Sequence, residues 1–194
     1  MGIATLPAET RVHRWTKGEY YAVTNSPAFA KRRVELLGGE IFDMSPIGPL
    51  HAAVVAHVHG VLSRLFPGHH VRAQLPFDAG EDSEPEPDLA VVPGKPLDYA
   101  DAHPRQADLI VEVADWSIAY DRGRKASKYA ASGITDYWVI NLPARRVEVF
   151  RKPVPDPAQP FGAGYASHDV LDANANIAPQ SFPAVTVAVR DLLP

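Results

Sequence analysis

Hydrophobic side chains recur at helical spacing in one long segment of the chain. The repeating positions are His51, Val55, Val58, Leu62 and Leu65. Residues with this spacing share one face of an α-helix. Pro49 suits the first turn of such a helix, and Pro67 with Gly68 would end it. The pattern therefore predicts an amphipathic helix from about residue 49 to residue 66.

Shorter apolar runs, bounded by glycine, proline and acidic residues, predict the strands of a sheet. Two runs between Arg33 and Met44 flank Gly38 and Gly39, and paired glycines are typical of a tight β-hairpin turn. The other predicted strands lie at residues 71–77, 88–92, 109–114, 137–141 and 146–150, and the tail near 184–189 offers one or two more. Because Pro76 cannot donate a backbone hydrogen bond, the strand that contains it is expected at a sheet edge.

A second helix is predicted after the strand at residues 109–114. Asp121 suits the N-cap position, the helix would run from Arg122 to Ser132, and Gly133 would end it. A short helix near residues 18–23 and a proline-rich loop at 153–160 complete the pattern. Helices that alternate with strands indicate an α/β fold. A length of 194 residues with no visible repeat or linker indicates a single domain, residues 1–194.

Two of the predicted strands carry an acidic residue in an apolar setting. Asp88 begins the strand at 88–92, and Glu112 lies in the middle of the strand at 109–114. A buried carboxylate is costly unless it is paired or binds a cation, and carboxylates on adjacent strands can share one divalent ion. The alternatives for Glu112 are a salt bridge or a water-facing edge position. For Asp88 the alternative is a turn that starts at Pro87.

The second predicted helix places three polar side chains on one face. Asp121, Lys125 and Tyr129 follow one another at four-residue intervals, so they lie one above the other. Lys125 would then reach back over the end of the strand that carries Glu112. The simpler alternative is a solvated helix face on which Asp121 caps the helix and pairs with Lys125.

Composition narrows the classes of protein. The chain has no cysteine, which excludes disulfides, thiolate metal sites and a cysteine nucleophile. A net charge of −4 argues against a protein that coats nucleic acid, although a nuclease with a local acidic site remains compatible. The best apolar run, residues 52–62, is too short to cross a bilayer, and the N-terminus lacks the order of a secretory signal. We therefore expect a cytoplasmic protein that does not enter a membrane.

Several short motifs occur in a fixed order along the chain. They are Val34-Glu35 with Gly39, Met44-Ser45-Pro46 before His51, Asp88-Leu89-Ala90-Val91-Val92, Leu109-Ile110-Val111-Glu112-Val113, and the run from Asp121 through Lys125 and Tyr129 to Gly133 and Trp138. In this order and spacing the chain resembles the Uma2 family (DUF820), which is related to restriction endonucleases. The resemblance covers roughly residues 33–150, with additional strands on the C-terminal side.

The resemblance implies a PD-(D/E)XK nuclease-like fold, in which a mixed β-sheet is flanked by helices. It implies that Asp88 and Glu112 bind Mg²⁺, with Mn²⁺ as a substitute, and that Lys125 orients or activates the attacking water. The ordinary position of that lysine is occupied by Ala114, and Asp115 stands where the family usually has serine.

Glu35, His51 and Tyr129 are further candidates for the site. For Glu35 an exposed strand position, and for His51 a buried core position, are the alternatives. The implied substrate is DNA, with the choice between DNA and RNA left open, and a homodimer is possible. Two other functions remain: a non-catalytic interaction module with the same fold, and a metal-dependent hydrolase of another phosphate ester.

Overall fold

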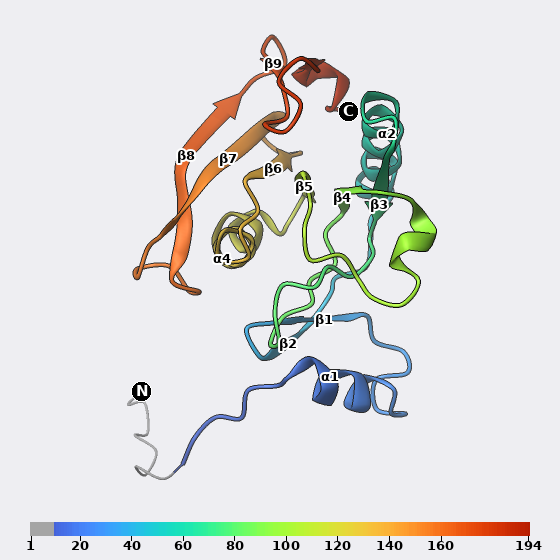
Figure 1. Cartoon of the computed structure of the whole chain (residues 1–194), viewed down its shortest axis with the longest axis vertical. Coiled ribbons are helices and arrows are strands. Elements are labelled where there is room, and N and C mark those ends of the chain that lie inside the picture. The colour runs from blue at the N-terminus through green and yellow to red at the C-terminus, as the bar shows by residue number, and fades with distance from the viewer. Residues whose placement is uncertain (1–9) are drawn as a thin grey trace.

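A six-stranded mixed sheet forms the centre of the molecule in the computed structural model, which describes residues 10–194 (Figure 1). The strands lie in the order β3 (His69–Ala73), β4 (Leu89–Pro93), β5 (Leu109–Ala114), β6 (Asp136–Asn141), β7 (Arg146–Pro155) and β8 (Ala163–Leu171). All neighbours are antiparallel except β5 and β6, which are parallel. The predicted α/β fold with a mixed sheet is confirmed. The first nine residues of the predicted domain lie outside the described residues.

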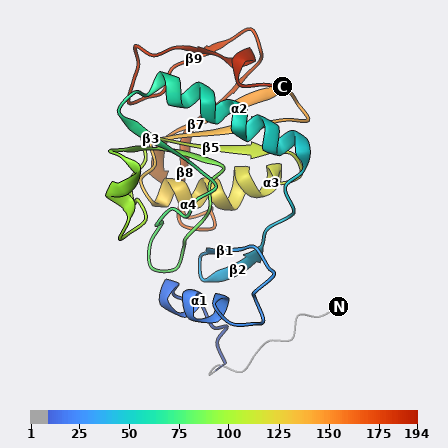
Figure 2. The same cartoon turned by 90° about the vertical axis from the view of Figure 1, so that its right-hand side faces the viewer.

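Helices cover both faces of the sheet (Figure 2). One face packs against α2 (Pro49–Leu65), and the other packs against a helical segment made of α3 (Ile118–Tyr120), a π-helical stretch (Asp121–Lys125) and α4 (Ala126–Ala131). Side chains alternate between the faces of a strand. Accordingly Val111 belongs to the core under α2, whereas Ile110 belongs to the core under α4. Glu112 has the same parity as Ile110 and therefore faces the second helical segment.

A smaller unit lies beside one end of these layers (Figure 2). It contains α1 (Lys17–Thr24) and a hairpin of β1 (Val34–Leu37) and β2 (Glu40–Asp43), as the glycine pair predicted. Gly38 and Gly39 take positive φ values of 62° and 70° in its turn, which glycine adopts without strain. The Tyr20 hydroxyl donates to the carbonyl of Val34 at 2.7 Å and thereby fixes α1 to the hairpin. An isolated bridge between Leu36 and Glu84 joins the hairpin to the loop before β4.

Three short elements close the C-terminal part of the chain. They are β9 (Asn176–Ile177), β10 (Val187–Ala188) and a 3₁₀ turn (Val189–Asp191). Elsewhere in the chain, another 3₁₀ turn (Pro96–Tyr99) follows β4. The strand predicted near residues 184–189 is thus reduced to the two residues of β10, paired with β9. No helix within residues 10–194 has the length and apolar character needed to span a bilayer.

The predicted N-cap of the second helix is wrong. The helical segment starts at Ile118, so Asp121 lies inside it, and Ser117 precedes the first turn. Acidic residues are tolerated in the first turns of a helix as well as at its cap, and sequence alone does not separate the two positions. The backbone of Asp121 is consequently helical, and the helix sets the direction of its side chain.

Two strand boundaries also differ from the prediction. β3 ends at Ala73, before Pro76, because Gln74 takes a left-handed φ of 51°. It is an edge strand, as expected. β7 continues to Pro155 and β8 follows it, so much of the predicted loop at 153–160 belongs to a long hairpin. Beyond Arg151, β7 pairs with β8 alone, and a strand with one free edge accommodates proline.

Candidate active site

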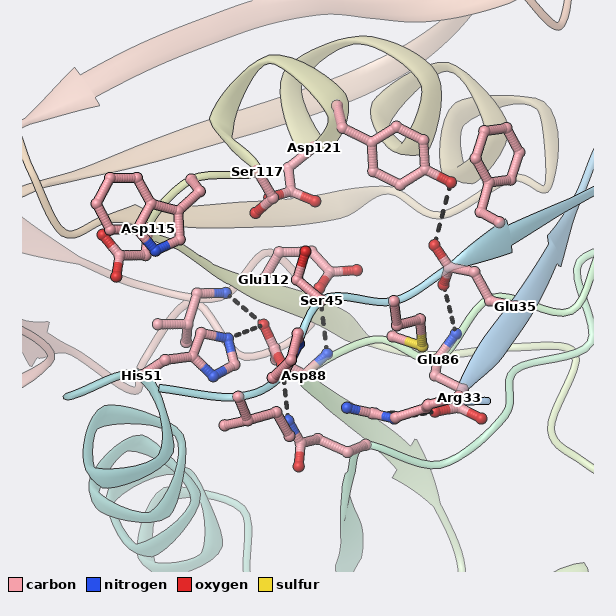
Figure 3. Close-up of a pocket in the computed structure, with 18 of the residues that line it drawn as sticks. Arg33, Glu35, Ser45, His51, Glu86, Asp88, Glu112, Asp115, Ser117 and Asp121 are labelled. Carbon is pink, nitrogen blue, oxygen red and sulfur yellow. Dashed lines mark hydrogen bonds and ion pairs between the residues drawn. The ribbon is translucent and has the colours of Figure 1, made fainter. Parts of the chain in front are cut away.

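A cavity of about 390 Å³ opens where the hairpin, the start of β4, the end of β5 and the first turns of two helices meet (Figure 3). Asp88, Glu112, Glu35, Asp121 and Lys125 all contribute to its wall. These residues come from segments far apart in the sequence, and the topology brings them to one end of the sheet. The cavity is therefore the first place to test the candidate residues.

Asp88 and Glu112 are neighbours across the antiparallel pair β4–β5. Leu89 is opposite Val111, so the residues just outside that pair, Asp88 and Glu112, also come together. The backbone N–H of Asp88 donates to Glu112 Oε2 at 3.2 Å, and the backbone N–H of Val113 donates to Asp88 Oδ2 at 2.9 Å. Each carboxylate is thus oriented by the backbone of the other strand. This mutual bonding fixes the two acids relative to each other.

Lys125 and Tyr129 reach Glu112 from the helical segment. Lys125 Nζ donates to Glu112 Oε1 at 2.9 Å and lies 3.5 Å from Glu35 Oε2. The Tyr129 hydroxyl donates to the same Glu112 oxygen at 2.8 Å. Lys125 is 5% exposed and Glu112 is 2% exposed. The alternative of a solvated helix face therefore does not apply, and the alternative of a salt bridge for Glu112 takes the form of an ion pair with this lysine.

Glu35 is buried at the rim of the same cluster, which contradicts the alternative of an exposed strand position. Its side chain is 2% exposed. The Tyr120 hydroxyl donates to Glu35 Oε1 at 3.1 Å, and the backbone N–H of Glu86 donates to Glu35 Oε2 at 3.2 Å (Figure 3). The hairpin thus adds a third carboxylate to the cavity.

His51 and Gln74 hold Asp88 from the other side. His51 Nε2 lies 3.1 Å from Asp88 Oδ2, and the Gln74 side-chain amide donates to Asp88 Oδ1 at 3.2 Å. His51 begins the apolar stripe of α2 but faces the cavity instead of the core (Figure 3). Its Nδ1 is buried without a hydrogen-bond partner among the described residues. A polar atom left unpaired in a cavity is available to a ligand or water.

Asp121 completes the acidic group from the helical segment. The Ser117 hydroxyl donates to Asp121 Oδ2, and the Asp121 side chain is 2% exposed. The carboxylate lies one turn before Lys125, inside the π-helical stretch. Such single-turn π stretches occur frequently at functional sites because they change which side chains share a helix face.

The protonation states follow from burial and crowding. Burial, reinforced by Asp88, Asp121 and Glu35, raises the pKa of Glu112 well above its ordinary value despite the opposing field of Lys125. Burial likewise raises the pKa of Asp121. Burial alone would lower the pKa of Lys125, but the surrounding carboxylates raise it well above its usual value. Lys125 is therefore an ammonium, and the buried acids around it resist being ionised together.

For Asp88 and His51, hydrogen bonds and nearby charges together outweigh the effect of burial on each pKa. Burial would raise the pKa of Asp88, but the hydrogen bond and charge of His51, with the backbone N–H of Val113 and the charge of Lys125, lower it overall. The hydrogen bond to Asp88 raises the pKa of His51 against the effect of burial. Asp88 thus ionises more readily than Glu112 or Asp121.

The donor set fits a hard divalent cation. Mg²⁺ prefers carboxylate oxygens, which Asp88 and Glu112 supply, with Glu35 and Asp121 nearby. A divalent charge would compensate the excess of buried carboxylates that otherwise raises the pKa of Glu112. No three histidine, aspartate or glutamate side chains of residues 10–194 are already gathered as metal ligands. The fit consequently rests on ligand type and on the crowding of buried acids.

Sequence reasoning missed several residues of the cavity, among them Gln74, Ser117 and Trp116. Gln74 lies in a segment predicted as strand, and its left-handed backbone carried no sequence signal. Ser117 was hidden by the assignment of the cap to Asp121. Trp116 stands in the predicted loop between the strand of Glu112 and the helix of Lys125, and an aromatic residue in such a loop was a usable signal.

Comparisons with known proteins identify the family and support the fold. The Uma2 family, described as "Putative restriction endonuclease", matches residues 18–190. A search of curated proteins found no significant match. Among solved structures, the chain is similar to a "putative nuclease belonging to DUF820" from Anabaena variabilis ATCC 29413, with 16% identity and a TM-score of 0.63 over 92% of this chain and 97% of that chain. The structural likeness supports the fold, and the match over most of the sequence shows that this chain belongs to the Uma2 family.

Proposed function

We propose that the chain is a Mg²⁺-dependent endonuclease that hydrolyses phosphodiester bonds, with DNA as the preferred substrate and the cytoplasm as its location. Asp88 and Glu112 would hold the ion, and Lys125 would act on the attacking water and on the phosphate. The observation that carries the proposal is the 2.9 Å approach of the Lys125 ammonium to Glu112, beside Asp88, in a cavity open to a ligand. The description of the family supports a nucleic-acid substrate.

Mg²⁺, when bound, supplies positive charge beside the phosphate and makes a nearby water more acidic. In its ion pair with Glu112, Lys125 is an ammonium, so it donates hydrogen bonds. Its role is to orient the water and to stabilise the charge that develops on the phosphate oxygens. The water oxygen forms a bond to phosphorus while the bond to the leaving oxygen breaks. The water releases its proton to solvent, and the leaving oxygen takes one up.

The remaining residues position these groups. His51 and Gln74 hold Asp88, and Tyr129 holds the Glu112 oxygen that also receives Lys125. Burial keeps the Tyr129 hydroxyl protonated by raising its pKa well above the ordinary value. Tyr129 is thus a fixed donor, and we assign it a positioning role.

A non-catalytic interaction module is the second candidate, favoured by the net charge of −4. Such a module has no need for two buried acids beside a buried lysine. A metal-dependent hydrolase of another phosphate ester would use the same site on a smaller substrate. The interaction module would show neither metal-linked stabilisation nor hydrolysis, and the other hydrolase would bind metal without cleaving DNA.

The test is a titration of Mg²⁺ and Mn²⁺ against thermal unfolding, with wild type, Asp88→Asn and Glu112→Gln. A ligand that binds only the folded state raises its stability in proportion to the logarithm of its concentration. Glu148→Gln is the matched control, because Glu148 is a buried, ion-paired strand glutamate outside the cavity. We expect metal-linked stabilisation in wild type and Glu148→Gln, and its loss in the two site variants.

Cleavage of plasmid and of single-stranded DNA is measured with the same four proteins. The proposal requires metal-dependent cleavage by wild type and Glu148→Gln only. Metal-linked stabilisation without cleavage of any DNA, but with hydrolysis of a small phosphodiester, favours the other hydrolase. Neither metal linkage nor hydrolysis favours the interaction module.

A further inference from the structure

Trp116 is the most exposed large apolar side chain of the described residues. It is 90% exposed and lies in the short connection between β5 and α3, four residues after Glu112. Its side chain lines the mouth of the acidic cavity. A tryptophan on a surface leaves a large apolar area in water, and such area near a pocket is typical of a binding site.

A second apolar segment borders the same cavity. Phe42, Met44, Pro46 and Ile47, which run from β2 towards α2, also line it, and Ile47 is 40% exposed. The outer part of the cavity therefore carries apolar side chains, beside the polar Asp43, Ser45 and Asp115, whereas its floor carries the buried carboxylates and Lys125. A nucleotide has the same two parts: a flat base with an apolar face, and a phosphate that needs a cation.

The depth of the acidic floor limits which strand can reach it. Glu112 and Asp121 are each 2% exposed, and Lys125 is 5% exposed. Duplex DNA is stiff, with a persistence length of about 150 base pairs, and holds its phosphates on a broad surface. A single strand bends at each nucleotide, so one phosphate can enter a pocket while the adjoining base turns outward. A cavity of about 390 Å³ is in the range that encloses a small ligand.

We propose that the cavity takes an unpaired nucleotide, with its base stacked on Trp116 and its phosphate at the acidic floor. The preferred substrate is consequently nucleic acid outside a base-paired stack, and not an intact duplex. The inference rests on the proposed function, since it concerns the substrate of that same site. Stacking on an aromatic ring tolerates any base, because every base has a π-face. Trp116 therefore selects for an unpaired strand and not for a sequence.

The test measures binding without cleavage, in Ca²⁺ in place of Mg²⁺. Fluorescence anisotropy follows three labelled DNA probes of equal length: a single strand, a blunt duplex, and a duplex with one unpaired bulge. We expect the single strand and the bulged duplex to bind more tightly than the intact duplex. Tight binding of the single strand alone would mean that the nucleotide must come from a free strand; equal binding of the bulge would mean that it can leave a helix.

Three variants test whether the Trp116 ring causes the preference for unpaired DNA. Trp116→Ala should weaken binding of the single strand by on the order of tenfold or more, whereas Trp116→Phe should retain most of the affinity because it keeps an aromatic face. Leu97→Ala is the matched control, since Leu97 is 85% exposed and lies outside the cavity. Thermal unfolding of all three variants should match wild type, because both side chains project into solvent.

The outcomes separate this inference from the proposed function. Equal affinity of wild type and Trp116→Ala for the single strand, or preferred binding and cleavage of the intact duplex, overturns the inference. Metal-dependent cleavage of the duplex by Trp116→Ala at the wild-type rate would leave the proposed nuclease standing without it. Binding that depends on Trp116, but with no metal-dependent cleavage of any probe, supports the unpaired-nucleotide site and removes the nuclease activity.

Discussion

The lysine of this site reaches the acid pair from a helix and not from the strand of Glu112. The strand position two residues after Glu112 holds Ala114, which is fully buried in the core under α4. Lys125 enters from that same side and forms its 2.9 Å contact with Glu112 Oε1. A charge that lies on a separate element can be removed without a change in the strand that orients the acids.

Replacement of Lys125 by alanine should lower the rate of DNA cleavage by roughly 10²–10³-fold, the usual effect of losing one donor that stabilises transition-state charge. Single-turnover cleavage at saturating Mg²⁺ measures it. Metal-linked thermal stabilisation should persist, since Asp88 and Glu112 remain. Lys128→Ala is the control, because Lys128 lies on the same helical segment and is buried in an ion pair with Asp82, outside the cavity. A Lys125→Ala protein that cleaves at the wild-type rate would contradict the role given to the lysine.

Glu148 is a buried acid outside the cavity, and its contribution to the stability of the fold is expected to depend on pH. Arg122, Asn141 and His168 all donate to its carboxylate. Burial would raise the pKa of Glu148, but these partners, with Arg122 first among them, lower it overall. A carboxylate with a depressed folded-state pKa stabilises the fold above its unfolded pKa, and this contribution is lost as the pH falls through the folded value.

Glu148→Gln should therefore be less stable than wild type at pH 7, and the gap should narrow as the pH falls below about 4.5, the ordinary pKa of the group. Urea unfolding at a series of pH values from 7 to 3 measures the difference in free energy of unfolding. A gap that stays constant across the series would show that the charge of Glu148 contributes nothing to stability.

At the scale of elements, the pattern of hydrophobic residues predicted the helices and strands that bury a continuous apolar face. The helix expected at residues 49–66 is α2 at 49–65, because its apolar stripe is buried against the sheet from Val54 to Leu62. The strands around Asp88 and Glu112 were predicted for the same reason. β8 was missed, because its residues Ala163–Leu171 alternate little and half of them face solvent. A strand that forms through pairing with β7, and not through a buried face, leaves only a weak pattern.

For the site, sequence predicted the residue types but not the way in which they are held. Asp88 and Glu112 stood out because charges in apolar runs need partners, and Lys125 stood out through its helical spacing from Asp121 and Tyr129 and through the family resemblance. The hydrogen bonds that hold these side chains depend on local backbone geometry, which the residue types alone do not reveal. Gln74, which donates to Asp88, has a left-handed φ of 51°, and Asp121 lies inside a helical segment that begins at Ile118.

The β1–β2 hairpin delivers Glu35 to the cavity, and its turn requires glycine. At Gly39, with a φ of 70°, an added Cβ would lie 2.8 Å from Arg14 Cβ and 3.1 Å from the Trp15 backbone nitrogen. Gly39→Ala should lower the free energy of unfolding by about 1–3 kcal/mol, from the left-handed backbone and this contact. Gly18→Ala, in α1 with no described atom within 4 Å of the new methyl, should instead be neutral or stabilising by up to about 1 kcal/mol. Urea unfolding compares the two alanine variants, and equal stabilities would contradict the strain assigned to the turn.

At the scale of the whole molecule, the chain end closes the core on the α2 side. Ile177, Val187 and Val189 pack with α2 and the sheet, and Leu192 and Leu193, which lie beyond the region matched by the family, join the same cluster. Without these residues one flank of the main core would meet water. The site at the other end of the layers depends on that core, because β4, β5 and α2 position Asp88, Glu112 and His51.

Leu192→Ala should therefore destabilise the entire fold, although the residue is two positions from the C-terminus. Leu192 is 0% exposed, and truncation of a buried leucine to alanine costs about 2–5 kcal/mol through lost burial and the cavity that remains. Leu97→Ala, at an exposed position, should change the stability by no more than about 0.5 kcal/mol. Urea unfolding followed by circular dichroism and by tryptophan fluorescence measures both, and the transitions should coincide if the tail and the sheet unfold together. A separate early transition, or a wild-type midpoint for Leu192→Ala, would show that the end of the chain lies on the core without contributing to it.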